Sequence, residues 1–460
     1  MQPSTRTIYE YFKDFAQSRP ECTFIFDERE RYTAEQAFKV ICSAAAHLAA
    51  AGVGRGVPVA VRTERTVHTV LSFFALQFVG ARAVLFDPRD GITGFDFIVE
   101  GDTLSAHGES ICLLSPSHGA FLPVAESFTP TMSIFTSGST GVPKRVDLSQ
   151  YNFVNNSLDT QYIGGYIPED INIDIVPIHH VFGLALIFTA VVLRHGIYVP
   201  QSVTPDCIID GIIRHGVTRL NGVPSLYLAM AEHERAPQIT SLRCGLIGGA
   251  PCTAEQFSFI ESRTGITLIP VYGMSECIGI SCADVNDPAE KRRVTVGRVY
   301  SMNEVSIAPD GEILVKSPAM AAGAAEEDGW LHTGDLGVID AEGFLSVCGR
   351  KKDIIIRNGN NLSSVAIERK VLSLPRVRDV CVVGLPDRRE GEVPAALIVL
   401  KDGDDGAGLQ DALAGVLLKN ELPARVIFAP SVPLTSSCKP DKQAVRAMFC
   451  NQRVDMQCRS

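Results

Sequence analysis

The chain has 460 residues, more than one hydrophobic core usually supports, so we expect at least two domains. Its 42 Lys and Arg residues against 52 Asp and Glu residues give a net charge of −10, which argues against a general binder of nucleic acid or of acidic membranes. The 13 cysteines show no zinc-ligand spacing, and we find neither a signal-peptide pattern nor the ~18 apolar residues of a membrane span, so we expect a cytoplasmic protein with reduced thiols.

An alternation of helices and strands predicts a parallel sheet in the N-terminal part of the chain. Residues 33–48 are expected to form a helix, because Thr33 and Gln36 have the spacing of a capping box ahead of an apolar run. The segments that follow are a strand at 57–61, a helix at 66–78 and a strand at 83–86. Strands that alternate with helices indicate a sheet covered on both faces.

The stretch IFTSGSTGVPKRVDLS, residues 134–149, is rich in glycine and in short hydroxyl side chains. A Walker A loop leads directly into a helix, but here Pro143 intervenes before Lys144 and residues 145–148 are expected to form a strand. Taken alone, such a stretch is more often an ordinary turn than a phosphate-binding loop. Its function must therefore be judged together with the motifs that follow.

The α/β pattern resumes after this loop and continues for more than a hundred residues. Short apolar runs predict strands, and the longer stretches between them predict helices. The strands are expected at 172–176, 196–199, 219–222, 244–247 and 267–271, and helices at 207–215 and 254–264.

From residue 297 the pattern changes to hairpins. One is expected at 305–315 with its turn at Asp310-Gly311, and another at 339–347, which suggests a small β-barrel subdomain. The charged run GRKKD at 349–353 then separates a compact α+β pattern of about the size of an independent domain. We therefore predict an N-terminal domain at 1–349 and a C-terminal domain at 350–460. The C-terminal elements are expected at 366–374 and 409–417 (helices) and at 377–384 and 395–400 (strands).

Six motifs occur in a fixed order along the chain. They are TSGSTGVPK (136–144), PIHHVFGL (177–184), GGAP (248–251), YGMSE (272–276), WLHTGDL (330–336) and GRKKDIIIRNGNNL (349–362). Together they resemble the motifs of the adenylate-forming superfamily, which includes acyl-CoA synthetases and aryl-CoA ligases, and the resemblance covers nearly the whole chain. It implies an α/β fold with a large N-terminal AMP-binding domain and a small mobile α+β C-terminal domain that turns about a hinge near 350–353.

The resemblance implies that the chain binds ATP and Mg²⁺. Backbone N–H groups and hydroxyls of the first motif can hold the β- and γ-phosphates, with a lysine as a point charge. Glu276 would be the Mg²⁺ ligand, since this ion needs few protein oxygens when phosphates supply the rest. Asp335 and Arg350 would contact the ribose or phosphate. The other nucleotide-binding residues would be Thr136, Ser137, Gly138, Ser139, Thr140, Gly141, Lys144, Gly248, Gly249, Ala250, Pro251, Tyr272, Gly273, Met274 and Ser275.

The catalytic residues are likewise implied by the resemblance. Lys439 in SSCKPDK stands at the place of the C-terminal catalytic lysine, which would stabilise charge as a carboxylate attacks the α-phosphate. His180 takes the place of the residue beside the acyl carboxylate, whereas His179 replaces what is usually an aromatic side chain and carries less weight. Lys352 takes the hinge position.

The implied function is that of an ATP-dependent carboxylic acid–CoA ligase, which forms acyl-AMP and pyrophosphate and then transfers the acyl group to CoA. Relatives that activate amino acids place an aspartate near the histidine motif. Residues 178–187 contain no carboxylate, so a carboxylic acid that is not an amino acid is favoured. A stand-alone ligase that loads the phosphopantetheine thiol of an acyl carrier protein has the same motifs and is the first alternative.

A nucleotide-binding homologue without turnover is the second alternative. Cys438 stands where the family usually has glycine, and Ser364 and Ala366 replace a common proline and glutamate. These departures lie in the C-terminal domain. Retention of Glu276 and Lys439 argues against loss of activity.

Overall fold

The structure, a computed structural model, describes residues 2–117, 119–124, 126–136, 144–434 and 440–457, and its chain forms two compact units. Unit 1 comprises Met1–Cys252, Gln256–Val305 and Val315–Leu331. Unit 2 comprises Thr253–Glu255, Ser306–Leu314 and His332–Ser460. Because unit 2 also takes in strands that precede residue 350, the domain boundary at 349–350 stays a prediction.

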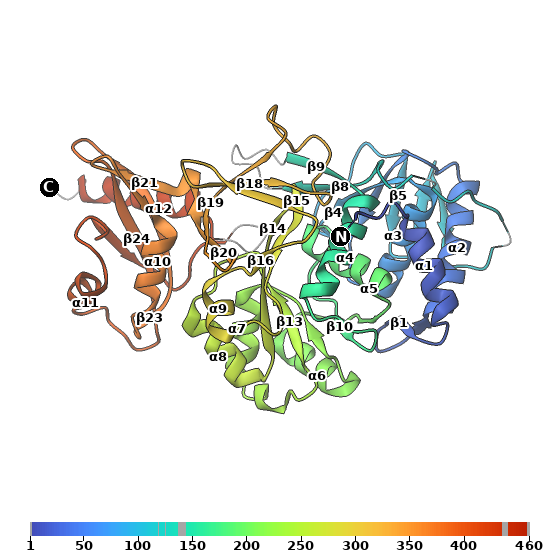
Figure 1. The fold of residues 1–460 in the computed structure, drawn as a ribbon, viewed down its shortest axis with the longest axis horizontal. Helices are drawn as coiled ribbons and strands as arrows, with labels where there is room; N and C mark the ends of the chain where they lie inside the picture. The colour runs from blue at the N-terminus through green and yellow to red at the C-terminus, as the bar shows by residue number, and fades with distance from the viewer. Residues whose placement is uncertain (1, 118, 125, 137–143, 435–439, 458–460) are drawn as a thin grey trace. The chain divides into compact units, whose positions relative to one another are not determined.

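A nine-stranded sheet in unit 1 has the order β16-β15-β14-β13-β12-β10-β11-β1-β2 (Figure 1). The strands from β14 to β1 along this order pair in parallel, and antiparallel strands complete both edges. The predicted parallel sheet is therefore confirmed. Its strands are β1 (Thr23–Phe26), β2 (Arg31–Thr33), β10 (Ile171–Ile173), β11 (Gly196–Tyr198), β12 (Arg219–Leu220), β13 (Cys244–Ile247), β14 (Thr267–Met274), β15 (Cys277–Cys282) and β16 (Arg298–Val299).

A seven-stranded sheet of unit 1 has the order β7-β6-β5-β3-β4-β8-β9. The four strands from β5 to β8 are parallel, and the edge hairpins are antiparallel. The predicted strands at 57–61 and 83–86 are β3 and β4. The strands are β3 (Pro58–Arg62), β4 (Arg82–Phe86), β5 (Phe97–Glu100), β6 (Thr103–Ala106), β7 (Glu109–Cys112), β8 (Pro130–Thr136) and β9 (Lys144–Ser149).

Helices α1 to α5 share one apolar core with strands of both sheets, whereas α6 to α8 pack with the nine-stranded sheet in a second core. The expected capping box is confirmed, because the Thr33 hydroxyl accepts the Gln36 N–H and the Gln36 side chain accepts the Thr33 N–H. The helices of unit 1 are α1 (Ile8–Ser18), α2 (Ala34–Ala50), α3 (Val67–Val79), α4 (Gln150–Ile163), α5 (Val181–Leu193), α6 (Pro205–His215), α7 (Pro224–Glu232), α8 (Ala254–Thr264, which begins in unit 2) and α9 (Ala289–Val294).

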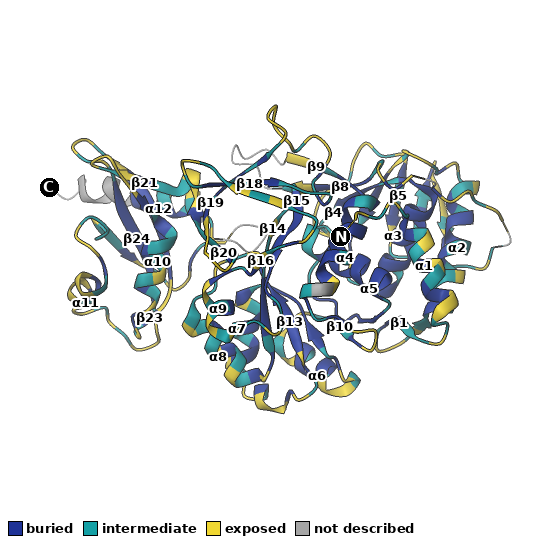
Figure 2. Cartoon of the chain, viewed as in Figure 1, coloured by how far each residue is buried: buried dark blue, intermediate teal, exposed yellow. Residues whose placement is uncertain are grey.

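Helix α5 follows the histidine motif and escapes prediction from sequence periodicity. Eleven of its residues, from Gly183 to Leu193, are buried, so the helix has no polar face to produce a 3.6-residue pattern (Figure 2). A helix enclosed on all sides is apolar throughout, and a buried strand has the same composition. The tertiary structure alone therefore identifies this segment as helical.

Unit 2 contains most of a four-stranded sheet of order β17-β18-β19-β20, whose remaining residues are assigned to unit 1. It also contains a five-stranded sheet of order β22-β21-β24-β23, with β25 paired to β24. Helices α10 and α11 pack on one face of the five-stranded sheet and α12 on the other. Both predicted hairpins are present, but a closed barrel is not confirmed. The elements are β17 (Glu304–Ile307), β18 (Glu312–Lys316), β19 (Leu331–Ile339), β20 (Leu345–Arg350), β21 (Ile354–Arg357), β22 (Asn360–Ser363), α10 (Ser364–Leu372), β23 (Val377–Asp387), β24 (Gly391–Leu400), α11 (Leu409–Val416), β25 (Arg425–Phe428) and α12 (Lys442–Gln457).

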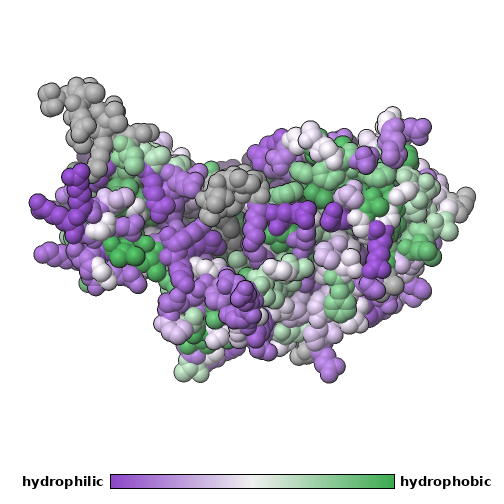
Figure 3. All heavy atoms as spheres, turned by 90° about the horizontal axis from the view of Figure 1, so that it is seen from above, coloured by the Kyte–Doolittle hydropathy of each residue, from purple (hydrophilic) through white to green (hydrophobic). Residues whose placement is uncertain are grey.

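Within the described residues, we find no helix with the length and apolarity needed to cross a bilayer. On the face drawn in Figure 3, hydrophilic and hydrophobic residues are interspersed. The apolar segments of the chain lie in the buried cores of the two units.

A carboxylate in the interior of unit 2 predicts a pH-dependent stability. Burial raises the pKa of Glu368 in α10 to about 7, and its Oε1 accepts the Val382 N–H at 2.8 Å. A raised carboxyl pKa stabilises the folded state below pH ~4.3, and this contribution is lost as the pH rises through 7. Glu368→Gln keeps an acceptor but cannot ionise, so we expect the variant to gain up to roughly 3 kcal/mol over the wild type between pH 5 and pH 8.

Thermal unfolding midpoints at these two pH values provide the measurement. Lys442 Nζ lies 3.9 Å from Glu368 Oε1, so Glu421→Gln, which removes a carboxylate paired with Lys370 in the same unit, is the matched control. A constant difference between Glu368→Gln and the wild type across this range would contradict the raised pKa.

Candidate active site

The predicted phosphate loop lies between two paired strands of the seven-stranded sheet. Thr136 ends β8 and Lys144 begins β9, and the two residues are opposite each other in the antiparallel register. The Thr136 hydroxyl donates to the Lys144 carbonyl at 3.3 Å. The expected strand after the loop is therefore confirmed. Ser137, Gly138, Ser139, Thr140 and Gly141 lie outside the described residues.

Lys144 is brought close to Glu276, the predicted Mg²⁺ ligand. Its Nζ lies 3.7 Å from Glu276 Oε1, although the first residue comes from the seven-stranded sheet and the second from the turn between β14 and β15. The Glu276 side chain is 19% exposed and that of Lys144 is 67% exposed. A cation and a carboxylate that are adjacent and partly open to solvent can contact a phosphate and its metal ion, respectively.

The GGAP and YGMSE motifs lie at the carboxyl ends of neighbouring parallel strands. Gly248 to Pro251 follow β13, and Tyr272 to Met274 end β14, which pairs with β13. The glycine of the second motif has a steric reason, because a Cβ on Gly273 would lie 2.0 Å from the Ile278 carbonyl oxygen across the hairpin. Tyr272 is half-buried, and Ser275 precedes Glu276 in the turn. Their contacts to a nucleotide stay predictions.

His180 is the N-cap residue of helix α5 and has an extended backbone. Its N–H donates to the Pro177 carbonyl at 3.0 Å, and its carbonyl accepts the Leu184 N–H at 3.1 Å. A Cβ on Gly183 would lie 2.3 Å from the Pro177 carbonyl oxygen, so this tight turn requires the glycine of the motif. The motif thus holds His180 at the start of a buried helix.

His179 is bound by groups that the sequence motifs do not include. Its Nδ1 lies 2.7 Å from the Thr63 hydroxyl, and its Nε2 lies 3.6 Å from Asp87 Oδ2. Asp87 is itself held by two bonds from the Arg89 guanidinium, each 2.8 Å long, and these lower its pKa. Thr63 follows β3 and Asp87 follows β4, which pair in parallel, so this cluster forms at the carboxyl ends of adjacent strands.

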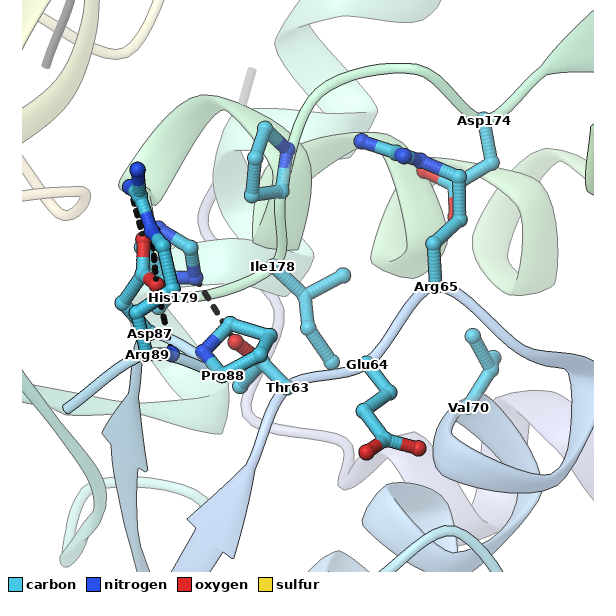
Figure 4. A pocket seen from close by; sticks show the side chains of 11 residues that line it. Thr63, Glu64, Arg65, Val70, Asp87, Pro88, Arg89, Asp174, Ile178 and His179 are labelled. Carbon is cyan, nitrogen blue, oxygen red and sulfur yellow. Dashed lines mark hydrogen bonds and ion pairs between the residues drawn. The ribbon is translucent and has the colours of Figure 1, made fainter. Parts of the chain in front are cut away.

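A cavity of about 340 Å³ opens beside His179 (Figure 4). Two of its carboxylates lie outside residues 178–187, so the absence of a carboxylate in that range does not describe the whole surroundings of His179. The first, Asp87, is paired with Arg89; the second, Asp174, is buried, and its burial raises the pKa to about 6. The cavity is lined by Thr63, Glu64, Arg65, Val70, Asp87, Pro88, Arg89, Asp174, Pro177, Ile178 and His179.

In unit 2, the structure joins the two residues predicted to contact ribose or phosphate. Asp335 on β19 and Arg350 on β20 are opposite each other in the antiparallel register. Arg350 Nε lies 2.8 Å from Asp335 Oδ1, and the Asp335 side chain is 6% exposed. The position of Asp335 therefore depends on a paired strand and not only on its own motif.

The predicted hinge is a short 3-10 turn, Lys351–Asp353, whose two ends are anchored by ion pairs. Lys351 Nζ lies 2.6 Å from Asp310 Oδ2 and 2.9 Å from Glu312 Oε2. At the other end, Asp353 Oδ2 lies 3.1 Å from Nζ of Lys442, the first residue of α12. Lys352 is the exposed residue between these two anchors, and its hinge role stays a prediction.

Lys439 and Cys438 lie outside the described residues, but the chain on either side is held in place. The Asp441 N–H donates to the Pro433 carbonyl at 2.8 Å, which brings the two ends of the segment together. Lys442 also donates to the Ser364 hydroxyl at 2.8 Å. A proline at position 364 could not accept this bond, so the departure at Ser364 has a structural role.

Comparison with known proteins decides the family. A model described as AMP-binding enzyme matches residues 12–107 and 108–323, and one described as AMP-binding enzyme C-terminal domain matches residues 366–439. The chain belongs to the AMP-binding enzyme family.

The similarity extends over almost the full length of known AMP-binding enzymes. The 2-succinylbenzoate–CoA ligase of Bacillus cereus (strain Q1) is 29% identical over 93% of this chain and 96% of its own. O-succinylbenzoate coenzyme A synthetase (MenE) from Bacillus subtilis, in complex with ATP and magnesium ion, is 25% identical with a TM-score of 0.81, over 95% of this chain and 98% of that one. ATP-bound MatB from Rhodopseudomonas palustris is 22% identical with a TM-score of 0.87, over 97% and 99% of the two chains, which confirms the fold.

The predicted metal site at Glu276 fits an ion that arrives with phosphates. Among the described residues, no group of three or more His, Cys, Asp and Glu side chains could hold a metal ion. Glu276 is a single carboxylate beside a loop lysine. Mg²⁺ commonly keeps waters and uses one or two carboxylates together with substrate phosphates. The donor set is therefore consistent with Mg²⁺ bound jointly by Glu276 and a nucleotide.

Substitution of Glu276 tests this arrangement. Glu276→Gln preserves shape but removes the charge, so we expect acid-dependent pyrophosphate release to fall by roughly a hundredfold and the Mg²⁺ concentration for half-maximal rate to rise. The measurement is the rate as a function of Mg²⁺. Glu304→Gln, an exposed carboxylate on β17, is the control. An unchanged rate of Glu276→Gln at limiting Mg²⁺ would remove this residue from the metal site.

Proposed function

We propose that this AMP-binding enzyme is an ATP-dependent carboxylic acid–CoA ligase. The observation that carries the proposal is the similarity to 2-succinylbenzoate–CoA ligase over 93% of this chain and 96% of that one, in both the AMP-binding and the C-terminal regions. ATP, Mg²⁺ and CoA are then the cofactor and substrates, together with a small carboxylic acid. The proposed acid is not an amino acid, and an aromatic acid such as 2-succinylbenzoate is the first to test.

In the first half-reaction, a carboxylate oxygen attacks the α-phosphorus of ATP, and pyrophosphate leaves with the electrons of the broken P–O bond. Lys144 and the loop from 136 to 144 would hold the leaving phosphates. Glu276 would bind the Mg²⁺ ion, which neutralises phosphate charge when it is bound. Asp335, held by Arg350 at 2.8 Å, would accept hydrogen bonds from the ribose hydroxyls.

In the second half-reaction, a thiol attacks the acyl carbonyl and AMP leaves. His180 would lie beside the reacting carboxyl group. Lys439 would act in the preceding half-reaction, where it would stabilise the charge that develops during adenylation. Rotation about Lys352 would withdraw Lys439 between the two steps, so that one site serves two reactions. The anchored ends of the Lys351–Asp353 turn support a pivot confined to this residue.

An acyl carrier protein is the alternative acceptor, because its phosphopantetheine thiol undergoes the same chemistry as CoA. A panel of aromatic and aliphatic acids, assayed with CoA and with a phosphopantetheinylated carrier protein, distinguishes the two acceptors. We expect pyrophosphate release with at least one acid and thioester formation when CoA is added. Acyl-AMP that accumulates in the presence of CoA but is consumed by a phosphopantetheinylated carrier protein would overturn CoA ligation. Failure to release pyrophosphate with any acid of the panel would favour the non-catalytic homologue.

The two half-reactions also assign a role to Lys439. We expect Lys439→Ala to slow acyl-AMP formation by roughly a hundred- to thousandfold, or ~2.7–4 kcal/mol, because an oriented contact to the transition state is lost. Thioester formation from supplied acyl-AMP should stay within about twofold of the wild type, since Lys439 would be withdrawn in that step.

Rates of both half-reactions, measured separately, provide the test. Lys419→Ala removes an exposed lysine of the same unit and is the control. Equal slowing of both half-reactions by Lys439→Ala would contradict alternation of the C-terminal domain.

A further inference from the structure

We propose that His179 accepts the proton of the attacking thiol in the second half-reaction. This inference rests on the proposed function and adds a catalytic residue that the adenylation motifs do not supply. It follows from three features of unit 1. They are an imidazole tautomer fixed by hydrogen bonding, a carboxylate close to the imidazole Nε2, and a cavity that the ring lines.

The hydrogen bonds of Thr63 decide which ring nitrogen carries the proton. The Thr63 hydroxyl lies 2.8 Å from the Phe86 carbonyl, which can only accept, so the single hydroxyl hydrogen is donated there. The 2.7 Å contact between Thr63 and His179 must then be donated by Nδ1–H. Neutral His179 therefore has its lone pair on Nε2, the nitrogen that can accept a proton.

Asp87 stabilises the protonated form of this ring. Its Oδ2 lies 3.6 Å from Nε2. This distance is too long for a hydrogen bond but short enough for the carboxylate to attract the positive charge of an imidazolium. Arg89 fixes the carboxylate with two bonds of 2.8 Å. The arrangement of an orienting hydroxyl, an imidazole and a carboxylate is that of a positioned base.

The cavity brings this base to the reacting group. His179 lines the cavity of about 340 Å³, and Figure 4 shows its ring next to Asp87 with its bond to Thr63. The ring centroid of His179 lies 4.4 Å from that of His180, the residue predicted to lie beside the acyl carboxyl group. In the proposed step, the thiol must reach the acyl carbonyl through this cavity, next to Nε2.

A neutral imidazole is the form required at pH 7. Burial lowers the pKa of His179, opposed by Asp87, so the unprotonated ring is available. Arg65 and Arg89 also lower the pKa of His179. The carboxyl groups of Glu64 and Asp174 line the same cavity, and the His180 ring lies alongside.

The proposed step balances as follows. The thiol S–H proton moves to Nε2, the sulfur electron pair forms the S–C bond to the acyl carbonyl, and the C–O bond to phosphate breaks so that AMP leaves with that electron pair. The imidazolium then returns its proton to solvent. With the pKa of ~8.5 of a free cysteine thiol taken for the acceptor, only about 3% is thiolate at pH 7, and a base can gain at most about thirtyfold in rate.

One experiment tests the geometry without any turnover. In ¹⁵N-histidine NMR of the intact chain at pH 8, with the resonance assigned from its loss in His179→Phe, we expect His179 to be the Nδ1–H tautomer. In Asp87→Asn we expect a lower His179 pKa, because the imidazolium loses its carboxylate. An Nε2–H tautomer would overturn the proposal, whatever the activity of the enzyme.

A second experiment measures thioester formation from supplied acyl-AMP and CoA between pH 6 and pH 9.5. We expect His179→Phe to be about ten- to thirtyfold slower than the wild type at pH 7 and within about twofold of it at pH 9.5, where the thiol ionises unaided. Adenylation by the same variant should change by less than about twofold. His233→Gln, which replaces another half-buried histidine that faces an aspartate, is the matched control and should follow the wild type at every pH.

A loss that is the same at every pH, a loss shared equally by adenylation, or no loss at all would overturn the role of His179. Failure of the proposed function gives a different result, because the wild type itself would then form no thioester at any pH. Thr63→Val keeps the ring but removes its orienting hydroxyl. We expect this variant to show a smaller defect than His179→Phe, with the same relief at high pH.

Discussion

Parallel strand pairing is the constraint on which the arrangement of unit 1 depends. Each parallel connection must leave a strand at its carboxyl end and cross back to the opposite edge, usually through a helix, so the loops that follow successive strands emerge at one edge of the sheet. Thr63 and Asp87 follow β3 and β4 in this way, and Gly248 and Tyr272 lie at the ends of β13 and β14. Segments far apart in the sequence therefore supply neighbouring side chains.

The two large sheets contribute different chemistry. Lys144 comes from the seven-stranded sheet and Glu276 from the nine-stranded sheet, and they meet at 3.7 Å. Helices α1 to α5 share one core with strands of both sheets, which fixes the sheets relative to each other within unit 1. The Lys144–Glu276 pair is partly solvated and contributes little to stability. Nucleotide phosphates and their metal ion can therefore separate the two side chains at a low cost in free energy.

Several residues predicted to bind substrate are paired with one another in the structure. Lys144 pairs with Glu276, and Asp335 pairs with Arg350 at 2.8 Å. Opposite charges that contact each other keep their side chains near the required positions and avoid isolated buried charge. The same principle extends to Lys351 and Asp353, whose ion pairs lie on either side of the predicted hinge residue.

The sequence by itself determined many of the elements and the family motifs, because these depend on local rules. The capping box at Thr33 and the regular strand–helix alternation follow from hydrogen bonding and burial over a few residues, and these were confirmed. The glycines of the motifs are required by close contacts: Gly183 approaches the Pro177 carbonyl and Gly273 that of Ile278. Such contacts lie within short segments, so the motif can record them.

Only the tertiary structure decided which distant groups share a site. The pattern around His179 gives no sign of Thr63 or Asp87, which lie more than ninety residues earlier and reach it through parallel pairing of β3 with β4. Helix α5 was likewise hidden, since burial on all sides removes the periodicity that distinguishes a helix from a strand. A single sequence records what each segment needs locally, whereas the partner of a side chain depends on how separate segments pack.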